Sequence, residues 1–425
     1  MRSNHFRCGI IILALLFITV FSSFAASAAP AGKYKVIYSF NGAPDAAYPG
    51  GLTFDADGNL YGTSGGGAYN FGAVFELKRT ADGWAESVLY SFTGDSGDTG
   101  PVTGVILDNA GNLYGLSDGY SDSYAYPAYV FKLAPNGHGE WTKSVLYKFD
   151  TSTHTYLQPQ NNLVVDSQGN LFGFLPSGSD GGLAFELKPG AKGDWKEVTL
   201  HSFKGTPDGA YLTSAALDQS GNVWGMATAG GTKRCVYIER VFGCGIVYEL
   251  TPDSSGKWSE TVVYEFTRGG GQSVNPSQGF LLESGSQLFG TAFSGGNGFG
   301  TVFELTRTRG SWEQQVLYRF LDYPDGQFPI GQLEMNSAGA LFGVTFYGGK
   351  NNLGIVFELD PSKTQDWGEK ILHSFVGGLD GSYPDAAVVF DSRGHLYGAT
   401  EEGGSGAGCG KTGCGVIYEI DPNSQ

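Results

Sequence analysis

The chain repeats a unit of about 55 residues seven times, and this period constrains the fold more than any single residue does. Each copy carries a Leu-aromatic-Gly step, with Val in place of Leu in one copy, and most copies place Asp-x-x-Gly-Asn just before it. Successive steps are 53, 58, 52, 65, 53 and 55 residues apart. The aromatic-Gly pairs are Tyr61-Gly62, Tyr114-Gly115, Phe172-Gly173, Trp224-Gly225, Phe289-Gly290, Phe342-Gly343 and Tyr397-Gly398. Such a period is typical of an array of similar structural units, and one closed array can take up the whole chain.

Each unit contains four short strand signals in the same order. In the first copy they cover residues 51–55, 60–63, 73–77 and 88–92, with the tight turn Asp55-Ala56-Asp57-Gly58-Asn59 between the first two. Apolar and polar residues alternate, β-branched and aromatic residues are frequent, and no helical period is visible after the first 28 residues. The pattern predicts an all-β fold, a seven-bladed β-propeller of four-stranded antiparallel blades.

The two ends of the chain indicate how the ring closes. Residues 34–40 carry a fourth-strand signal, whereas the chain ends shortly after a third-strand signal at 417–420. We therefore expect strand 34–40 to complete the last blade, which removes an exposed strand edge. The prediction is a single propeller domain over residues 34–420, followed by a short tail at 421–425.

The first 28 residues have the pattern of a signal peptide. Arg2 and Arg7 precede an apolar run at 10–21, and Ala26-Ser27-Ala28 forms a small-residue cleavage site. The apolar run is too short for a membrane helix. We expect a secreted protein, periplasmic or extracellular, that has no membrane span after cleavage of residues 1–28.

The four cysteines beyond that segment form two local pairs. In an exported chain these pairs predict the disulfides Cys235–Cys244 and Cys409–Cys414. Each pair brackets the Gly-rich loop that precedes a third strand. Zinc is not expected at either pair, because no His lies beside them.

The repeat motifs resemble those of the bacterial tandem-repeat GloVer family, a choice-of-anchor group with a Gloeobacter/Verrucomicrobia-type repeat. The shared pattern is Pro-x-x-Gly-Leu, Asp-x-x-Gly-Asn-Leu-Tyr-Gly-Thr-Thr, Gly-Gly, Gly-Thr-Val-Phe-Glu-Leu and Leu-Tyr-Ser-Phe. It covers nearly all of residues 34–420, and residues 391–400 with 416–420 are a good copy. The Gly-Asn turn is lost at residues 285–287 and 339–340. The resemblance implies the fold and export, and it supplies no active site.

The charge balance excludes some classes of partner. The formal net charge is −16 at pH 7, and nucleic acids or anionic membranes require basic patches. We expect no nucleic-acid partner and no cofactor. His201 and His373 occupy a position that holds Tyr in other copies, which favours packing, and no His spacing indicates a metal centre.

Variable loops between strands two and three, and between blades, should share one face of the ring. Paired carboxylates and aromatic residues there are candidates for binding: Asp45, Tyr48, Asp208, Tyr211, Tyr323, Asp325, Asp380 and Tyr383. Such pairs suit a glycan, because rings stack on sugar faces and carboxylates accept hydroxyl hydrogen bonds. They also suit structural Ca²⁺, or they merely set turn geometry.

No catalytic residue is predicted. The Gly-x-Ser-x-Gly pattern occurs at residues 62–66 and 115–119, but each copy begins in the second-strand signal of its unit and no helical period follows it, so neither forms a nucleophile elbow. We expect a secreted, non-catalytic propeller that binds a glycan or a cell-envelope protein on its loop face. One alternative is a carbohydrate-active hydrolase or lyase that uses paired Asp residues on that face. The other is a purely structural envelope component.

Overall fold

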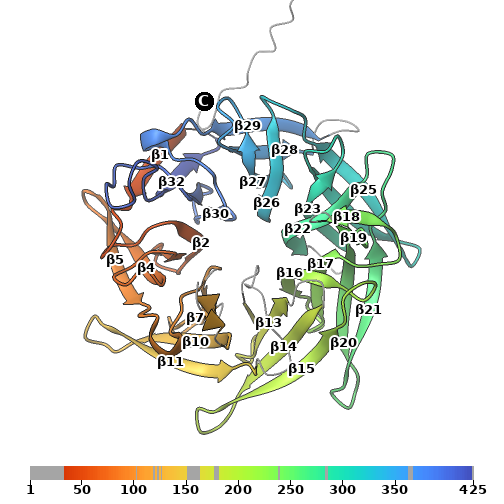
Figure 1. Cartoon of the computed structure of the whole chain (residues 1–425), viewed down its shortest axis with the longest axis horizontal. Coiled ribbons are helices and arrows are strands. Elements are labelled where there is room, and N and C mark those ends of the chain that lie inside the picture. Colours follow the sequence, from red (N-terminus) through yellow and green to blue (C-terminus); the bar gives the residue numbers. More distant parts are fainter. Residues whose placement is uncertain are drawn as a thin grey trace, which may run out of the picture. The chain divides into compact units, whose positions relative to one another are not determined.

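The computed structural model describes residues 33–423 except 102, 118–119, 122–123, 126, 151–162, 177–180, 238–239, 283–285 and 362–366. Ala31–Gln425 form one compact unit. Within it, seven four-stranded antiparallel sheets lie around a central axis (Figure 1). The predicted seven-bladed β-propeller is confirmed. No helix of the described residues is long and apolar enough to cross a membrane.

In each blade the strands are given in order from the centre of the ring to its outer edge (Figure 1). Blade one consists of β2 (Pro49–Phe54), β3 (Leu60–Ser64), β4 (Ala73–Thr80) and β5 (Gly83–Ser91). Blade two consists of β6 (Ile106–Leu107), β7 (Leu113–Ser117), β10 (Tyr129–Pro135) and β11 (Trp141–Lys148). Blade three consists of β12 (Val164–Val165), β13 (Leu171–Pro176), β14 (Gly182–Pro189) and β15 (Trp195–Phe203). Blade four consists of β16 (Ala210–Leu217), β17 (Val223–Ala229), β20 (Ile246–Pro252) and β21 (Trp258–Glu265). Blade five consists of β22 (Ser273–Leu282), β23 (Gln287–Gly295), β24 (Thr301–Thr308) and β25 (Ser311–Arg319). Blade six consists of β26 (Gly326–Met335), β27 (Leu341–Gly348), β28 (Ile355–Asp360) and β29 (Gly368–Ser374).

The seventh blade combines both ends of the chain. Its sheet contains β30 (Val389–Phe390), β31 (Leu396–Thr400), β32 (Val416–Asp421) and, at the outer edge, β1 (Lys33–Ser39). β1 lies antiparallel to β32, with Tyr34 opposite Ile420 and Ser39 opposite Val416.

Two small hairpins and two 3₁₀ turns lie outside the blades. The hairpins are β8 (Tyr120–Ser121) with β9 (Tyr124–Ala125), and β18 (Cys235–Tyr237) with β19 (Arg240–Phe242). The turns η1 (Asp95–Gly97) and η3 (Gly378–Asp380) are the helical elements of the described residues.

The glycine of each Leu-aromatic-Gly step lies under an aromatic ring of the third strand. A Cβ at Gly62 would lie 2.4 Å from Phe75 Cζ, and one at Gly115 would lie 2.3 Å from Phe131 Cζ. The same overlap occurs in the other five blades, at Gly173, Gly225, Gly290, Gly343 and Gly398. Any side chain here would displace the ring, so this part of the repeat is a packing requirement.

That ring also contacts the next aromatic residue across the blade junction. A fully or almost fully buried Phe just after or at the end of each outer strand packs on the third-strand ring of the following blade, with centroids 4.7 to 5.4 Å apart. The seven pairs are Phe40–Phe75, Phe92–Phe131, Phe149–Phe185, Phe203–Tyr248, Phe266–Phe303, Phe320–Phe357 and Phe375–Tyr418. One aromatic contact therefore recurs at all seven junctions.

The Asp-x-x-Gly-Asn turn is held by its own side chains. Asp55 Oδ1 accepts hydrogen bonds from the backbone N–H groups of Asp57 and Asn59, and its Oδ2 accepts one from the Asn59 side chain. Tyr61 donates its hydroxyl to Glu76, the Glu of the third-strand motif, at 2.7 Å. The repeat residues thus satisfy one another within the blade, and a calcium loop is not needed to explain them.

A backbone hydrogen bond adds a second link between blades. At four junctions, the residue before a proline in or near the inner strand donates its N–H to a loop carbonyl of the preceding blade, as Phe328 does to Phe299 at 2.8 Å. The glycine after that carbonyl, Gly300, has φ +96° and faces Pro329 of the next blade. The same link joins Tyr48 to Cys414, Asn275 to Cys244 and Tyr383 to Leu353.

Both predicted disulfides are present and confirmed. Cys235–Cys244 encloses the β18–β19 hairpin, and Cys409–Cys414 lies in the loop before β32. Cys244 and Cys414 also supply the carbonyls of two of these links between blades. The bridges therefore hold the loop segments that contact the next blade.

Replacing Gly300 with Ala tests this second link. The added Cβ would lie 2.4 Å from Pro329 Cδ and 2.7 Å from the Ala292 carbonyl oxygen. We expect Gly300→Ala to lower the free energy of unfolding by about 3 kcal/mol or more. Gly298→Ala is the matched control, because Gly298 has φ +103° but no atom within 4 Å of the added Cβ.

Backbone strain alone should cost the control about 1–2 kcal/mol. Urea unfolding of the two variants measures the difference, and equal losses would show that the contact with Pro329 contributes nothing.

Candidate functional site

The four predicted aspartates lie in the loops that connect one blade to the next. In each case the carboxylate accepts the N–H of the residue four positions before it, at 2.7 to 3.0 Å: Asn41 to Asp45, Lys204 to Asp208, Leu321 to Asp325 and Val376 to Asp380. It also contacts the ring seven positions before it, which is Tyr38, His201, Tyr318 or His373. These contacts give all four aspartates a role in loop geometry, and ligand binding by them stays a prediction.

A second carboxyl group faces three of these aspartates from the outer strand of the following blade. The pairs are Glu86 with Asp45, Glu260 with Asp208, and Glu369 with Asp325. Burial and then the neighbouring carboxylate raise the pKa of Glu86 to about 8 and that of Glu260 to about 7. The pKa of Glu369 is raised for the same two reasons. Glu86 therefore holds its proton at pH 7.

Other residues occupy this place at two further junctions. The three Glu residues just named each lie two residues after the Trp of their strand. At the same spacing from Trp, the second blade has Lys143 and the fifth blade has Gln314. Lys143 forms an ion pair with Asp98. One junction geometry thus accepts an acid, an amide or a base.

The predicted tyrosines divide into two groups. Tyr48, Tyr211 and Tyr383 share a left-handed backbone with φ of 55° to 56° at the start of an inner strand. Tyr323 lies in a loop before β26 and is 59% exposed. Of these four tyrosines, Tyr383 contacts other rings in a cluster.

Five aromatic side chains form a continuous row across blades five, six and seven, which we call the aromatic arc: Phe293, Phe328, Phe346, Tyr347 and Tyr383. Phe293 stacks on Phe328 with centroids 4.5 Å apart, and Phe346 stacks on Tyr383 at 5.3 Å. Tyr347 joins the two stacks through edge contacts to Phe328, Phe346 and Tyr383. Phe293 is 41% exposed and Tyr347 is 38% exposed, so the arc presents ring surface to solvent.

Carboxylates stand at the blade-seven end of the aromatic arc. Glu401 donates its backbone N–H to the Tyr383 carbonyl, and desolvation followed by the charge of Glu402 raises the pKa of the Tyr383 hydroxyl. Asp385 is exposed, yet protein atoms crowd it on most sides. This desolvation and the charge of Glu401 raise the pKa of Asp385 to about 6.

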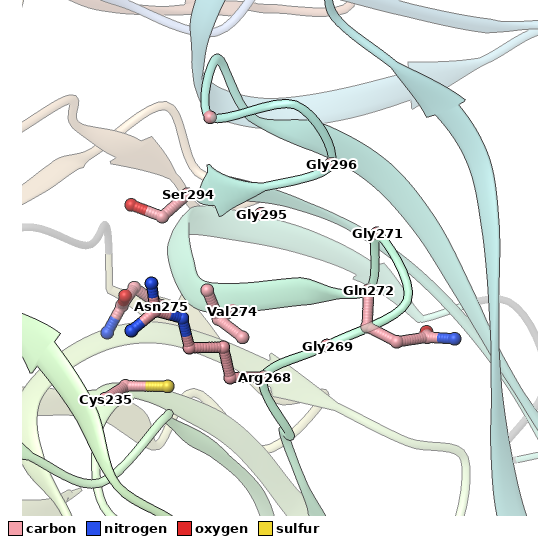
Figure 2. Close-up of a pocket in the computed structure, with 11 residues that line it drawn as sticks. Cys235, Arg268, Gly269, Gly271, Gln272, Val274, Asn275, Ser294, Gly295 and Gly296 are labelled. Atoms are coloured by element: carbon pink, nitrogen blue, oxygen red, sulfur yellow. The ribbon is translucent and has the colours of Figure 1, made fainter.

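A pocket of about 400 Å³ lies beside the other end of the arc (Figure 2). Cys235 and Arg268 line it together with Ser294, the residue after Phe293. Among the described residues Arg268 has no hydrogen-bond or ion-pair partner. The loop face thus places a free cation near one end of the arc and carboxylates at the other.

Three residues of the aromatic arc, Phe293, Phe328 and Phe346, were not predicted from the sequence. Phe328-Pro329 repeats the pattern of Tyr48-Pro49 and Tyr383-Pro384, so this aromatic-Pro pair was a usable signal. Phe293 and Phe346 lie near the ends of the second strands of their blades, each four residues after the aromatic residue of the Leu-aromatic-Gly step. Nothing in the sequence shows that they stack on the following blade.

Comparison with known proteins identifies the repeat and the fold. The model of the Gloeobacter/Verrucomicrobia repeat matches residues 22–239 and again residues 235–425. Comparison with curated protein sequences finds no significant match.

Solved structures that resemble the chain include an ulvan-degrading polysaccharide lyase, with 12% identity, coverage of 91% of this chain and 95% of that one, and a TM-score of 0.53. A glucose dehydrogenase has 13% identity, coverage of 78% of this chain and 100% of that one, and a TM-score of 0.44. A luciferin-regenerating enzyme has 13% identity, coverage of 75% and 91%, and a TM-score of 0.41. At 12% identity the likeness to the lyase shows the fold alone.

The raised pKa of Glu86 makes stability depend on pH. Its pKa is about 8 in the folded protein against the usual 4.5, so its stabilising contribution is complete below about pH 4.5 and is lost as the pH rises through 8. Gln stands at the equivalent place in blade five, so Glu86→Gln should fold normally. We expect the variant to gain about 2 kcal/mol relative to the wild type between pH 5 and pH 8.

Urea unfolding at both pH values measures this gain. Glu313→Gln, at an exposed position, is the control and should show no such change. A pH-independent difference for Glu86→Gln would contradict the proposed protonation of Glu86.

Proposed function

We propose that this chain, which belongs to the Gloeobacter/Verrucomicrobia repeat family, is a secreted β-propeller that binds a glycan along the aromatic arc of its loop face. The observation that carries this proposal is the exposed row of stacked rings from Phe293 to Tyr383. Aromatic faces are the surfaces on which sugar rings stack. The carboxylates beyond Tyr383 can accept hydrogen bonds from sugar hydroxyl groups.

The backbone at the arc supports a binding role for its rings. Phe328 and Tyr383 adopt φ of 57° and 56°, a conformation that is costly for bulky residues and unusual before proline. The link between blades does not require an aromatic residue here, because Asn275 makes the same hydrogen bond and Gly100 makes an equivalent one. Asn and Gly tolerate this conformation better. An aromatic ring therefore adds strain without improving the link, as is common at ligand sites.

Two disulfides support the proposed location. Such bridges persist in oxidising compartments, which include the periplasm and the cell exterior. Glycans of the cell envelope or its surroundings are the ligands that a propeller in those compartments would meet.

A second candidate is a carbohydrate-active hydrolase or lyase at the carboxylate end of the arc. Asp385 has a pKa raised to about 6 and lies within electrostatic reach of Glu401. A glycosidase requires two neighbouring carboxyl groups, one of which keeps its proton near neutral pH, and a raised pKa is in the direction that the acid of such a pair needs. In this case Asp385→Asn should abolish oligosaccharide turnover while leaving binding in place, and mass spectrometry of the products would detect it.

Glycan binding can be tested with an array of neutral and acidic oligosaccharides, followed by calorimetry on the ligands that bind. We expect Tyr347→Ala to lower the affinity about tenfold, because Tyr347 contacts both stacks of the arc. Tyr323→Ala is the matched control: Tyr323 is more exposed and, among the described residues, has no ring contact with the arc.

Equal losses in both variants, or a loss in Tyr323→Ala alone, would contradict binding along the arc and return the site to the loops predicted from the sequence. Absence of any bound oligosaccharide, together with capture of a defined envelope protein, would favour the protein-partner alternative.

A further inference from the structure

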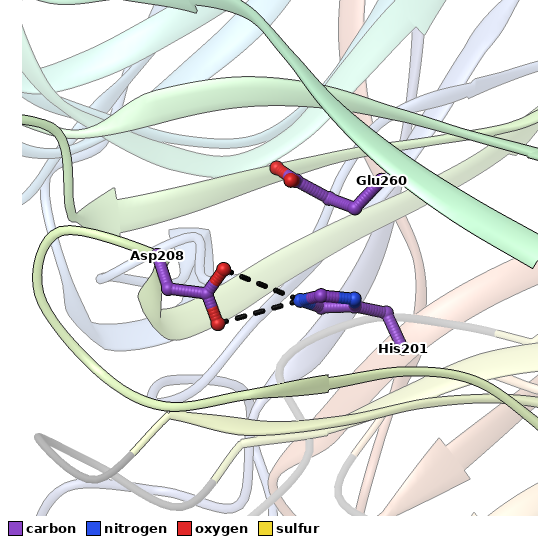
Figure 3. A group of neighbouring side chains, drawn as sticks. All are labelled: His201, Asp208 and Glu260. Atoms are coloured by element: carbon purple, nitrogen blue, oxygen red, sulfur yellow. Dashed lines mark hydrogen bonds and ion pairs between the residues drawn. The ribbon is translucent and has the colours of Figure 1, made fainter.

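The junction between blades three and four gathers one imidazole and two carboxyl groups. His201 lies on β15, Asp208 lies in the loop that follows, and Glu260 lies on β21 of the next blade (Figure 3). One nitrogen or oxygen atom from each of the three lies within 4.8 Å of the other two. Among the described residues, no other group of His, Cys, Asp and Glu meets this geometry.

The side chains of this cluster are held in place by their neighbours. His201 Nε2 lies 3.3 Å from both carboxylate oxygens of Asp208, and the edge of the imidazole packs against Phe203 at 4.5 Å. Lys204 donates its backbone N–H to Asp208 at 2.8 Å. Fixed orientation of this kind is what the surroundings of a metal ligand provide.

Glu260 contributes a carboxylate oxygen without a hydrogen-bond partner, as Glu86 and Glu369 do at the equivalent places of their junctions. Its Oε1 atom is shielded from solvent and has no hydrogen-bond partner among the described residues. A shielded carboxylate oxygen without a donor is costly, so it calls for a proton or a cation. His201, Asp208 and Glu260 are each only partly buried, which leaves a path for an ion.

The other blade junctions show what is special about this one. The junction of Tyr318, Asp325 and Glu369 has a phenol where His201 stands, and the Tyr318 hydroxyl donates a hydrogen bond to Asp325. At the junction of His373 and Asp380, the ring of Tyr34 stacks on the imidazole at 3.6 Å. The first therefore lacks a nitrogen ligand and the second lacks a second carboxylate.

We propose that His201, Asp208 and Glu260 bind a divalent cation of the Zn²⁺ type at the junction of blades three and four. One imidazole and two carboxylates balance the charge of such an ion, and three protein ligands leave a position for water. Ca²⁺ is disfavoured, since it takes six to eight oxygen ligands. The ion would link β15 to β21, and with them two adjacent blades. No His spacing in the sequence indicates this site, because the three residues meet only in the folded ring.

Calorimetry with tag-free full-length chain, disulfides intact and stripped with a chelator, tests the site with Zn²⁺ as the probe. We expect one equivalent of Zn²⁺, lost or weakened about 100-fold or more by His201→Tyr and by Glu260→Gln. Tyr and Gln occupy these places at other junctions, so both variants should fold. His373→Tyr is the matched control and should retain full binding. With Co²⁺, a visible absorption band should appear in the wild type and vanish in His201→Tyr.

A gain of function gives the strictest test. Tyr318→His places an imidazole beside Asp325 and Glu369, and we expect this variant to bind a second equivalent of Zn²⁺. No Zn²⁺ binding by the wild type, equal binding by wild type and His201→Tyr, or equal losses in His201→Tyr and His373→Tyr would each overturn the assignment. Tighter binding of Ca²⁺ than of Zn²⁺ would also overturn it.

Discussion

Seven aromatic contacts across blade junctions are the constraint on which the rest of this structure depends. At each junction a Phe from one outer strand packs on the third-strand ring of the next blade, and that ring lies over a glycine with no room for a side chain. The glycine allows the ring to sit close to the second strand. The ring in turn fixes the distance to the neighbouring blade. Because Phe40 and Phe75 make the same contact between the first and last blades, the packing is uniform around the ring.

This packing separates the residues that repeat from the residues that can vary. In the first blade the Asp, Asn, aromatic and Glu residues of the motif, Asp55, Asn59, Tyr61 and Glu76, hydrogen bond to one another. The hydrogen-bonding groups of these residues are therefore occupied within the blade. Variation occurs at positions that the scaffold holds in place, such as the left-handed residue near the start of several inner strands. Asn275 satisfies the backbone there, whereas Phe328 and Tyr383 add an exposed ring.

The polar junctions illustrate how one geometry acquires different chemistry. A ring, an aspartate and a third side chain meet at the same relative places in several junctions. With Tyr38 and Glu86 the set holds a proton at neutral pH, and with Lys143 it forms an ion pair. With His201 and Glu260 it presents three potential ligands for a metal ion. A single substitution at a repeated place is therefore enough to change the function of a junction without changing the fold.

The sequence was enough to predict the number of blades, the order of strands and both disulfides, because these follow from local patterns that recur along the chain. It also placed Asp45, Asp208, Asp325 and Asp380 on the loops between blades, although the hydrogen bonds that occupy their carboxylates were not foreseen. Which side chains from different blades meet depends on the folded ring. Phe293 stacks on Phe328, and Glu260 approaches His201, through packing between neighbouring units. A periodic pattern fixes what each unit is, whereas contacts between units depend on the angle and distance at which the packed rings hold them.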